Sequence, residues 1–128
     1  MRKFLFSAVL VIILAACSGN KPDFAAAHAA SDYYNLLVDG KVGEFVDGMD
    51  MPDSIPTSYR EQLIANAKMF LAQQQEEHKG LKKVDVMNCV NDSLSQTANA
   101  FLMFCYGDST VEEIVVPMVK RDGKWLMK

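Results

Sequence analysis

The sequence has only two histidines and three cysteines among its 128 residues. They form neither a Cys-x-x-Cys nor a His-x-x-x-His spacing, which argues against a zinc site. His28 lies near the polar edge of an expected helix and His78 in the last turn of another, so both are interpreted as surface or capping residues. No Gly-x-Ser-x-Gly elbow and no glycine-rich phosphate loop is present. We therefore expect no catalytic residue set, no metal and no cofactor.

Positive charge is also scarce. The formal net charge is −3, and no stripe of lysine and arginine follows any expected helix. A mildly acidic surface repels phosphate backbones, so nucleic acid is excluded as an expected partner.

The longest apolar run, residues 4–14, is shorter than the roughly 20 residues that span a bilayer. Because Arg2 and Lys3 precede it, the run is typical of a signal peptide. The following Leu14-Ala15-Ala16-Cys17 resembles the lipobox read by lipoprotein signal peptidase. We expect cleavage after residue 16 and a lipid on Cys17; the alternative is a plain secretory signal or signal-anchor with a chance cysteine.

A lipid on Cys17 would anchor the protein to a membrane of the cell envelope. Two or three acyl chains on one residue hold far more firmly than a single chain. Residues 17–22 are small, polar and broken by glycine and proline, as expected of a flexible tether. By resemblance, Ser18 after the cysteine indicates delivery to the outer membrane, while the side that the domain faces stays open.

Residues 23–128 carry the composition of one globular domain, and their first half predicts three helices. The first follows Asp23 as a cap and stops at Gly40. The second covers residues 41–47, and the third follows a capping box at residues 58–61 and ends at residues 78–80. Residues 49–57 contain two prolines and are expected to be loop.

From Leu81 the apolar pattern changes to a period of two. Val84, Val86 and Val90 predict a first strand with one buried face, and residues 98–106, 111–120 and 125–128 predict three more. Asn91-Asp92-Ser93 and Asp122-Gly123 are turn sequences. Pro117 implies an edge position or a bulge. The predicted fold class is α+β, with three helices packed on a four-stranded antiparallel meander.

The order of these elements carries a family resemblance. A helix ending in Leu-Leu-Val-Asp-Gly-Lys, a short helix with Phe45, a longer helix, and a meander closing on residues 119–127 (VKRDGKWLM) resemble small bacterial lipoproteins of the nuclear-transport-factor-two-like (cystatin-like) superfamily. The chain looks closest to the lumazine-binding-like domain of unknown function. The resemblance implies a curved sheet that wraps helices into a cone with one open end.

Enzymes of that superfamily place an Asp, a Tyr or a His–Asp pair inside the cone, and no such set can be matched here. Asp32, Tyr33 and Tyr34 are adjacent, and neighbouring helix residues point about 100° apart, so they cannot all face one pocket. The residues expected to face the cone are Tyr34, Phe45, Tyr59, Phe70, Met118 and Trp125. Two interpretations stay open, a closed core or a pocket for a small apolar or amphiphilic ligand.

Cys89 and Cys105 could form a disulfide in an oxidising compartment. The expected hairpin places them about seven residues apart along the strands, over roughly 20 Å, whereas bridged Cα atoms lie about 4.4–6.8 Å apart. We predict two free, largely buried thiols.

The strand at residues 98–106 is apolar on both faces, with Phe101 and Met103 on one and Leu102 and Phe104 on the other. If helices cover one face, the other exposes an apolar surface typical of an interface. A second copy or another envelope protein is the expected partner there. The favoured function is a non-catalytic ligand-binding or assembly module; the alternative is an isomerase- or hydrolase-like enzyme using the cone.

Overall fold

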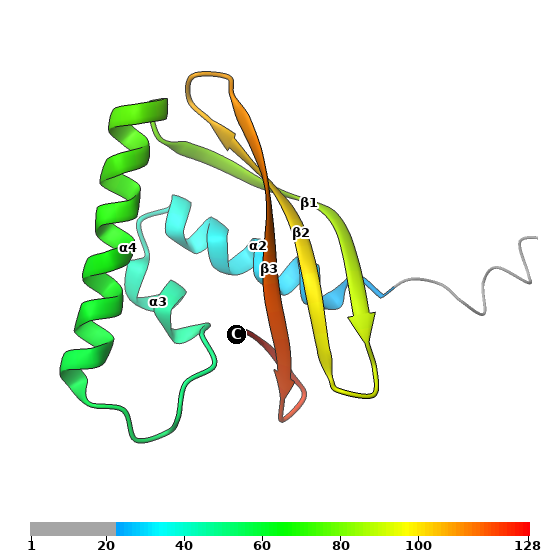
Figure 1. Cartoon of the computed structure of the whole chain (residues 1–128). Coiled ribbons are helices and arrows are strands. Elements are labelled where there is room, and N and C mark those ends of the chain that lie inside the picture. The colour runs from blue at the N-terminus through cyan, green and yellow to red at the C-terminus, as the bar shows by residue number, and fades with distance from the viewer. Residues whose placement is uncertain (1–22) are drawn as a thin grey trace, which may run out of the picture.

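The computed structural model describes residues 23–128. The signal peptide at residues 1–16 and the tether at residues 17–22, including the lipid site Cys17, lie outside the described residues. Three helices precede four strands (Figure 1), and the expected α+β class is confirmed. The elements are α2 (Ala25–Val38), α3 (Val42–Asp47), α4 (Thr57–His78), β1 (Leu81–Asp92), β2 (Thr97–Tyr106), β3 (Val111–Arg121) and β4 (Lys124–Met127).

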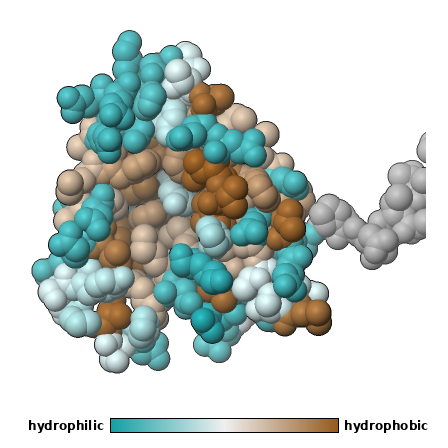
Figure 2. All heavy atoms as spheres, in the orientation of Figure 1, coloured by the Kyte–Doolittle hydropathy of each residue, from teal (hydrophilic) through white to brown (hydrophobic). Residues whose placement is uncertain are grey.

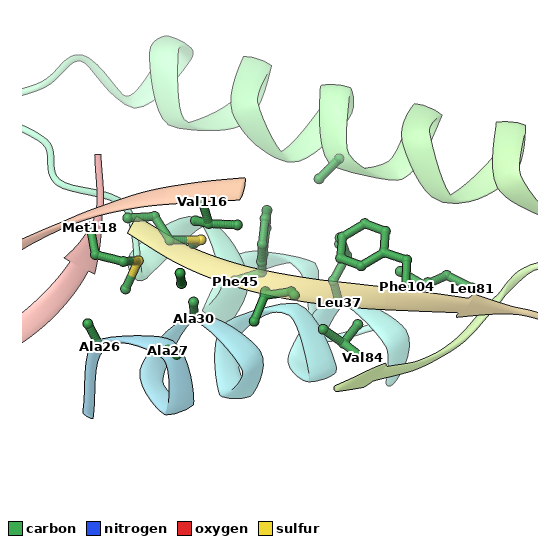
Figure 3. Close-up of a cluster of buried hydrophobic side chains, with 14 of the residues drawn as sticks. Ala26, Ala27, Ala30, Leu37, Phe45, Leu81, Val84, Phe104, Val116 and Met118 are labelled. Atoms are coloured by element: carbon green, nitrogen blue, oxygen red, sulfur yellow. The ribbon is translucent and has the colours of Figure 1, made fainter. Parts of the chain in front are cut away.

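The four strands form one antiparallel sheet in the order β1-β2-β3-β4. Helix α2 crosses one face of this sheet, whereas α4 stands beside it, nearly along the direction of β3 (Figure 1). Ala26, Ala27 and Ala30 on α2 are fully buried, since small side chains let the helix approach the strands closely. Figure 3 shows these alanines pointing towards the sheet that carries Val116 and Met118.

The sequence marked four helix ends, and both C-terminal ends are found. At the start of α2 the N-cap residue is Phe24 rather than Asp23, whose carboxylate accepts from the Ala25 amide over 2.9 Å. Gly40 adopts a φ of 81° after α2, and Lys79 and Gly80 adopt φ values of 61° and 92° after α4. The capping box expected at residues 58–61 is wrong. Helix α4 already begins at Thr57 behind an extended Pro56, and no side chain caps it. Ser58 is then inside the first turn, where its hydroxyl is not placed to accept from the amide of residue 61.

Strand β1 departs from simple alternation at two register shifts, one between Leu81 and Lys83 and one between Val86 and Asn88. Met87 is the extra residue of the second shift, a bulge, and beyond it the strand's two faces exchange. Cys89 is therefore buried, while Val90 is 54% exposed. The expectation that Val90 shares the buried face of Val84 and Val86 is wrong for this reason.

Pro117 lies where β3 becomes an edge. Strand β4 pairs with residues 118–121 of β3, and the Lys128 amide just beyond it donates to the Pro117 carbonyl over 2.9 Å. Residues 111–116 have only β2 as a neighbouring strand, so Pro117 stands where this edge begins, although β3 is an inner strand by order. Asp122 and Gly123 turn between β3 and β4 with φ values of 51° and 78°, as a two-residue hairpin requires.

The segment after α3 adds a short fifth partner to the sheet. Met49 forms a parallel bridge with Met127, and the Asp50 amide donates to the Met127 carbonyl over 2.6 Å. The Met127 amide in turn donates to the Gly48 carbonyl over 2.8 Å. This pairing fixes the loop between α3 and α4 at the end of the sheet away from the β2–β3 hairpin. Within residues 23–128, no helix has both the length and the apolar composition to cross a bilayer.

Candidate functional site

An apolar cavity of about 280 Å³ lies between α4 and the helix-covered face of the sheet. All helices and the two central strands contribute to its wall: Tyr34 of α2, Phe45 of α3, Ala67 and Phe70 of α4, Phe104 of β2, and Glu112 and Ile114 of β3. Figure 2 shows apolar side chains gathered over β3 and in the hollow between β3 and α4. The volume is just below the usual range for ligand pockets, about 300–1,000 Å³.

Helix α4 packs only lightly on the core, through Ala67 and the partly buried Leu63, Ile64, Phe70 and Leu71, and hydrogen bonds hold its two ends. Only Ala67 and Gln74 of its 22 residues are buried. Near the N-terminal end, the Arg60 guanidinium donates to Asp47 over 3.0 Å and to the Gly43 carbonyl over 3.3 Å. These contacts tie the N-terminal end of α4 to α3.

The C-terminal end of α4 is held by the β2–β3 hairpin. The Asp108 amide donates to the His78 carbonyl over 3.0 Å, and the Gly107 amide donates to the Gly80 carbonyl over 2.8 Å. The approach at Gly107 is so close that a β-carbon there would collide with the Lys79 carbonyl. We call the residues His78, Gly80, Gly107 and Asp108 the hairpin clasp.

Four aromatic rings form the inner wall of the cavity. The ring centroid of Tyr34 lies 5.0 Å from that of Phe45, in an edge-to-face pair, and 5.2 Å from that of Phe104. The centroids of Phe70 and Phe104 are 6.5 Å apart. Burial raises the pKa of the Tyr34 phenol, so this group stays neutral at physiological pH. A ligand in the cavity would contact the faces and edges of these aromatic rings, none of which carries a charge.

Glu112 is the one ionisable carboxyl in the cavity wall. Its Oε1 accepts a hydrogen bond from the Tyr106 phenol over 2.8 Å. Tyr106 is buried, and its ring stacks on His78 with 4.6 Å between the centroids. Burial and then the bond to Glu112 raise the Tyr106 pKa, so the phenol keeps its proton and remains a donor.

His78 and Asp108 form a His–Asp pair with 3.0 Å between Nδ1 and Oδ2. The Thr110 hydroxyl donates to Asp108, and this bond is the main cause that lowers the Asp108 pKa to about 2. Neither His78 nor Asp108 belongs to the cavity wall. The pair is part of the hairpin clasp, on the far side of Tyr106 from the aromatic wall.

Three of the six expected cone residues, Tyr34, Phe45 and Phe70, meet at this cavity. The other three do not, and the expectation is corrected for them. Tyr59 is 51% exposed in the first turn of α4, before the helix reaches the sheet. Met118 is fully buried in the core, since it faces the alanines of α2.

Trp125 lies on β4, towards the N-terminal end of α2 and away from the aromatic wall. Its carbonyl accepts from the Tyr33 phenol over 2.6 Å, and the Lys120 ammonium lies 5.8 Å from its ring centroid. Tyr33 and Tyr34 thus make different contacts, Tyr33 with Trp125 and Tyr34 with the cavity wall, as expected of adjacent helix residues that point about 100° apart. His28 and Asp32 are exposed.

Sequence reasoning missed Glu112 and Tyr106. The hairpin places residue 106 of β2 and residue 112 of β3 on the same face as Phe104, with Glu112 directly opposite Phe104 in the register. The signal that could have identified Glu112 is a charged residue at an inward position of a strand.

Cys89 and Cys105 are free, as predicted. Cys89 pairs with Ala100 in the register and Cys105 with Lys83, so the two cysteines lie five residues apart along the strands. Five residues of strand span about 17 Å, beyond the reach of a disulfide. Cys89 is buried and Cys105 is half-buried. Within residues 23–128, no three His, Cys, Asp or Glu side chains converge as metal ligands would.

A larger, polar hollow of about 730 Å³ lies at the opposite end, around the β3–β4 hairpin. Asp47, Asp50 and Arg121 are part of its wall. Arg121 bonds Asp50 over 3.0 Å and Arg60 bonds Asp47 over 3.0 Å, while Asp53, Asp122 and Lys124 of the same wall form no ion pair within residues 23–128. Because small-molecule sites are lined mainly by apolar and aromatic side chains, we consider the apolar cavity the better candidate site.

No protein-family model matches the chain, and no curated protein matches it in sequence. Among solved structures, the chain is similar to the crystal structure of a Campylobacter jejuni protein assigned as an NTF2-like transpeptidase. The TM-score is 0.62 with 14% sequence identity, and the match covers 77% of this chain and 92% of that chain. This likeness shows that the chain has the NTF2-like (nuclear-transport-factor-two-like) fold, as the sequence resemblance implied.

Proposed function

We propose that this protein is an envelope lipoprotein, anchored through Cys17 to the outer membrane, whose NTF2-like fold binds a small apolar or amphiphilic molecule without converting it. The proposal that the protein binds a ligand is supported by the aromatic cavity beside α4. Its wall contains Glu112 as its single carboxyl, and the Tyr34 phenol in the same wall has a pKa raised by burial, so this phenol is a poor proton donor at neutral pH. The anchor is supported by the lipobox-like sequence before Cys17.

The test is recovery of the bound molecule. The full chain is produced with its lipid, purified from envelopes, and extracted with organic solvent for mass spectrometry. Ala67→Phe fills the cavity from α4, and Ala72→Phe places the same ring on the exposed side of that helix. We expect a small molecule that co-purifies with the wild type and with Ala72→Phe but is absent from Ala67→Phe. Equal recovery from all three proteins, or from none, would refute binding in the cavity.

The anchor has its own test, because a lipid is independent of the cavity. Cys17→Ser removes the expected acceptor thiol, so we expect the variant to leave the membrane fraction or to remain uncleaved. Mass spectrometry of the wild-type N-terminal peptide should show acyl chains on Cys17. An unmodified Cys17 in the membrane-derived protein would refute the lipoprotein assignment.

A second candidate function is an enzyme. The His78–Asp108 pair is the observation that favours it, together with the transpeptidase assignment of the structural neighbour. His78→Gln separates the two functions. If the same molecule is recovered unchanged from the wild type and from His78→Gln, binding alone is supported; a modified molecule found only with the wild type would support catalysis.

We also propose that the uncovered face of the sheet contacts a second copy or another envelope protein. Val111 and Val115 of β3 and Val90 of β1 are more than half exposed on this face. Phe101 and Met103 lie between them on β2, half-buried. Contiguous apolar surface of this kind is typical of interfaces.

A further inference from the structure

The wall of the apolar cavity carries one unmatched charge. Glu112 sits at the exposed rim, beside Phe104 and Ile114, and its pairing with Phe104 in the register directs it to the helix side of the sheet. Each carboxylate that forms an ion pair within residues 23–128 lies elsewhere: Asp47, Asp50, Asp85 and Asp108. Among these described residues, no lysine, arginine or histidine is within ion-pair distance of Glu112.

The Glu112 carboxylate is also held in place. Tyr106 donates to Oε1 over 2.8 Å, and this phenol is fixed between His78, stacked at 4.6 Å, and Phe104, with 6.4 Å between ring centroids. One carboxylate oxygen is thereby engaged, and Oε2 has no hydrogen-bond donor among residues 23–128. A carboxylate accepts several hydrogen bonds, so capacity remains for a donor from a ligand.

From this arrangement we infer that the ligand is a small cationic amphiphile, whose apolar body fills the aromatic cavity and whose amine or guanidine group binds Glu112 at the rim. This inference rests on the proposed binding function and specifies its ligand class. The rim position matters because a cation there keeps part of its hydration, and its desolvation cost is smaller than in the interior. An anion would meet the Glu112 charge without a compensating cation.

The cavity itself limits the size of the apolar body. At about 280 Å³ it admits a single ring or a short chain rather than a long acyl tail. A primary ammonium would make a charge-assisted hydrogen bond to Glu112, and such bonds are roughly twice as strong as neutral ones. The aromatic wall carries no formal charge and its ring faces also favour a cation, so the Glu112 carboxylate is the group that sets the sign of the preferred head group.

The inference is tested with three probes of one chain length: hexylammonium, hexanol and hexanoate. The lipidated protein is reconstituted in zwitterionic nanodiscs, and binding is measured by calorimetry at pH 7 with empty nanodiscs as the reference. We expect the wild type to bind hexylammonium about tenfold more tightly than hexanol, and hexanoate most weakly. In Glu112→Gln this preference for the ammonium should vanish while hexanol binding stays the same.

Glu113→Gln is the matched control. Glu113 follows Glu112 directly, is exposed, and pairs with Met103 on the opposite face of the sheet. We expect this variant to keep the full preference for hexylammonium. An equal loss of the hexylammonium preference in the two variants would overturn the inference, and so would similar binding of all three probes to the wild type. Either result would still be compatible with a cavity that binds apolar molecules. If none of the probes bound the wild type, the proposed binding function would fail as well.

Discussion

The ring of Tyr33 lies so close to Gly48 that a β-carbon at position 48 would collide with three of its ring atoms. The same Tyr33 donates through its phenol to the Trp125 carbonyl on β4. One side chain of α2 therefore fixes both the segment after α3 and the last strand. The backbone of Gly48 is ordinary, with a φ of −82°, so a side chain is excluded here by space rather than by backbone conformation.

Gly48→Ala should destabilise the protein by about 1–3 kcal/mol, because overpacking displaces a ring held by a hydrogen bond. The measurement is urea unfolding followed by circular dichroism. Tyr33→Ala provides the control, since Gly48→Ala in that background has no ring to displace and should cost much less. A similar cost in both backgrounds would show that the collision with Tyr33 is not the cause.

Tyr106 should make the fold sensitive to alkali. Its pKa is raised in the folded protein by burial first and by the Glu112 bond second. The unfolded chain releases this proton near pH 10 while the folded chain retains it, so the stabilisation is complete below pH 10 and decreases as the pH rises further. We expect the free energy of unfolding of Tyr106→Phe to decrease less between pH 8 and 11.5 than that of the wild type. An identical pH dependence in the variant would contradict the assignment.

The cysteines predict a thiol count. Of the three cysteines in the chain, Cys17 would be blocked by lipid, and Cys89 and Cys105 would remain free. Titration of the unreduced protein in denaturant should find two thiols per chain. No thiol would contradict the strand register, and three would contradict lipidation.

The two free thiols should also differ in the folded protein. Burial is the main cause that raises the Cys89 pKa, which keeps its reactive thiolate scarce, whereas Cys105 is only half-buried. We expect Cys105 to be alkylated first under native conditions. Cys105→Ser should remove the fast phase, and a fast phase that survives in this variant would refute the order.

From the apolar side chains on the uncovered sheet face we expect contact with a second copy of the chain or with another envelope protein. Val115 is 51% exposed on this face, and Val115→Asp places a charge in its centre. If the protein forms dimers in sedimentation experiments, this variant should be monomeric. Leu94→Asp is the control, because Leu94 is 97% exposed at the tip of the β1–β2 hairpin, away from the face. A wild type that remains monomeric at high concentration would argue against self-pairing.

Local sequence signals predicted most of the fold. Gly40 and Gly80 mark helix ends because positive φ favours glycine, and Asp122-Gly123 marks a hairpin for the same reason. Periodicity located every helix and strand. What it could not supply was the bulge at Met87, since an extra residue in a strand depends on how the partner strand pairs rather than on the residue itself.

Only some residues of the candidate site could be predicted from the sequence. Tyr34, Phe45 and Phe70 could be predicted because large apolar side chains on the inner stripes of helices must face the sheet. Trp125 was wrongly expected at the cavity, because an inward-pointing side chain on β4 does not indicate which end of the sheet β4 occupies. The pairing of Glu112 with Tyr106 needed the β2–β3 register, which brings residues six apart into contact.

The bulge in β1 has a consequence at the level of the gene. Met87 and Asn88 together stand opposite one residue of β2, so loss of the single codon for Met87 would leave regular pairing from Lys83 to Asp92 with Cys89 still pointing inward. Loss of the codon for Val84 or Asp85 would instead turn over every side chain on one side of the gap. The two register shifts, at positions 82 and 87, are therefore where descendants of the chain could shorten this strand without rebuilding their interior.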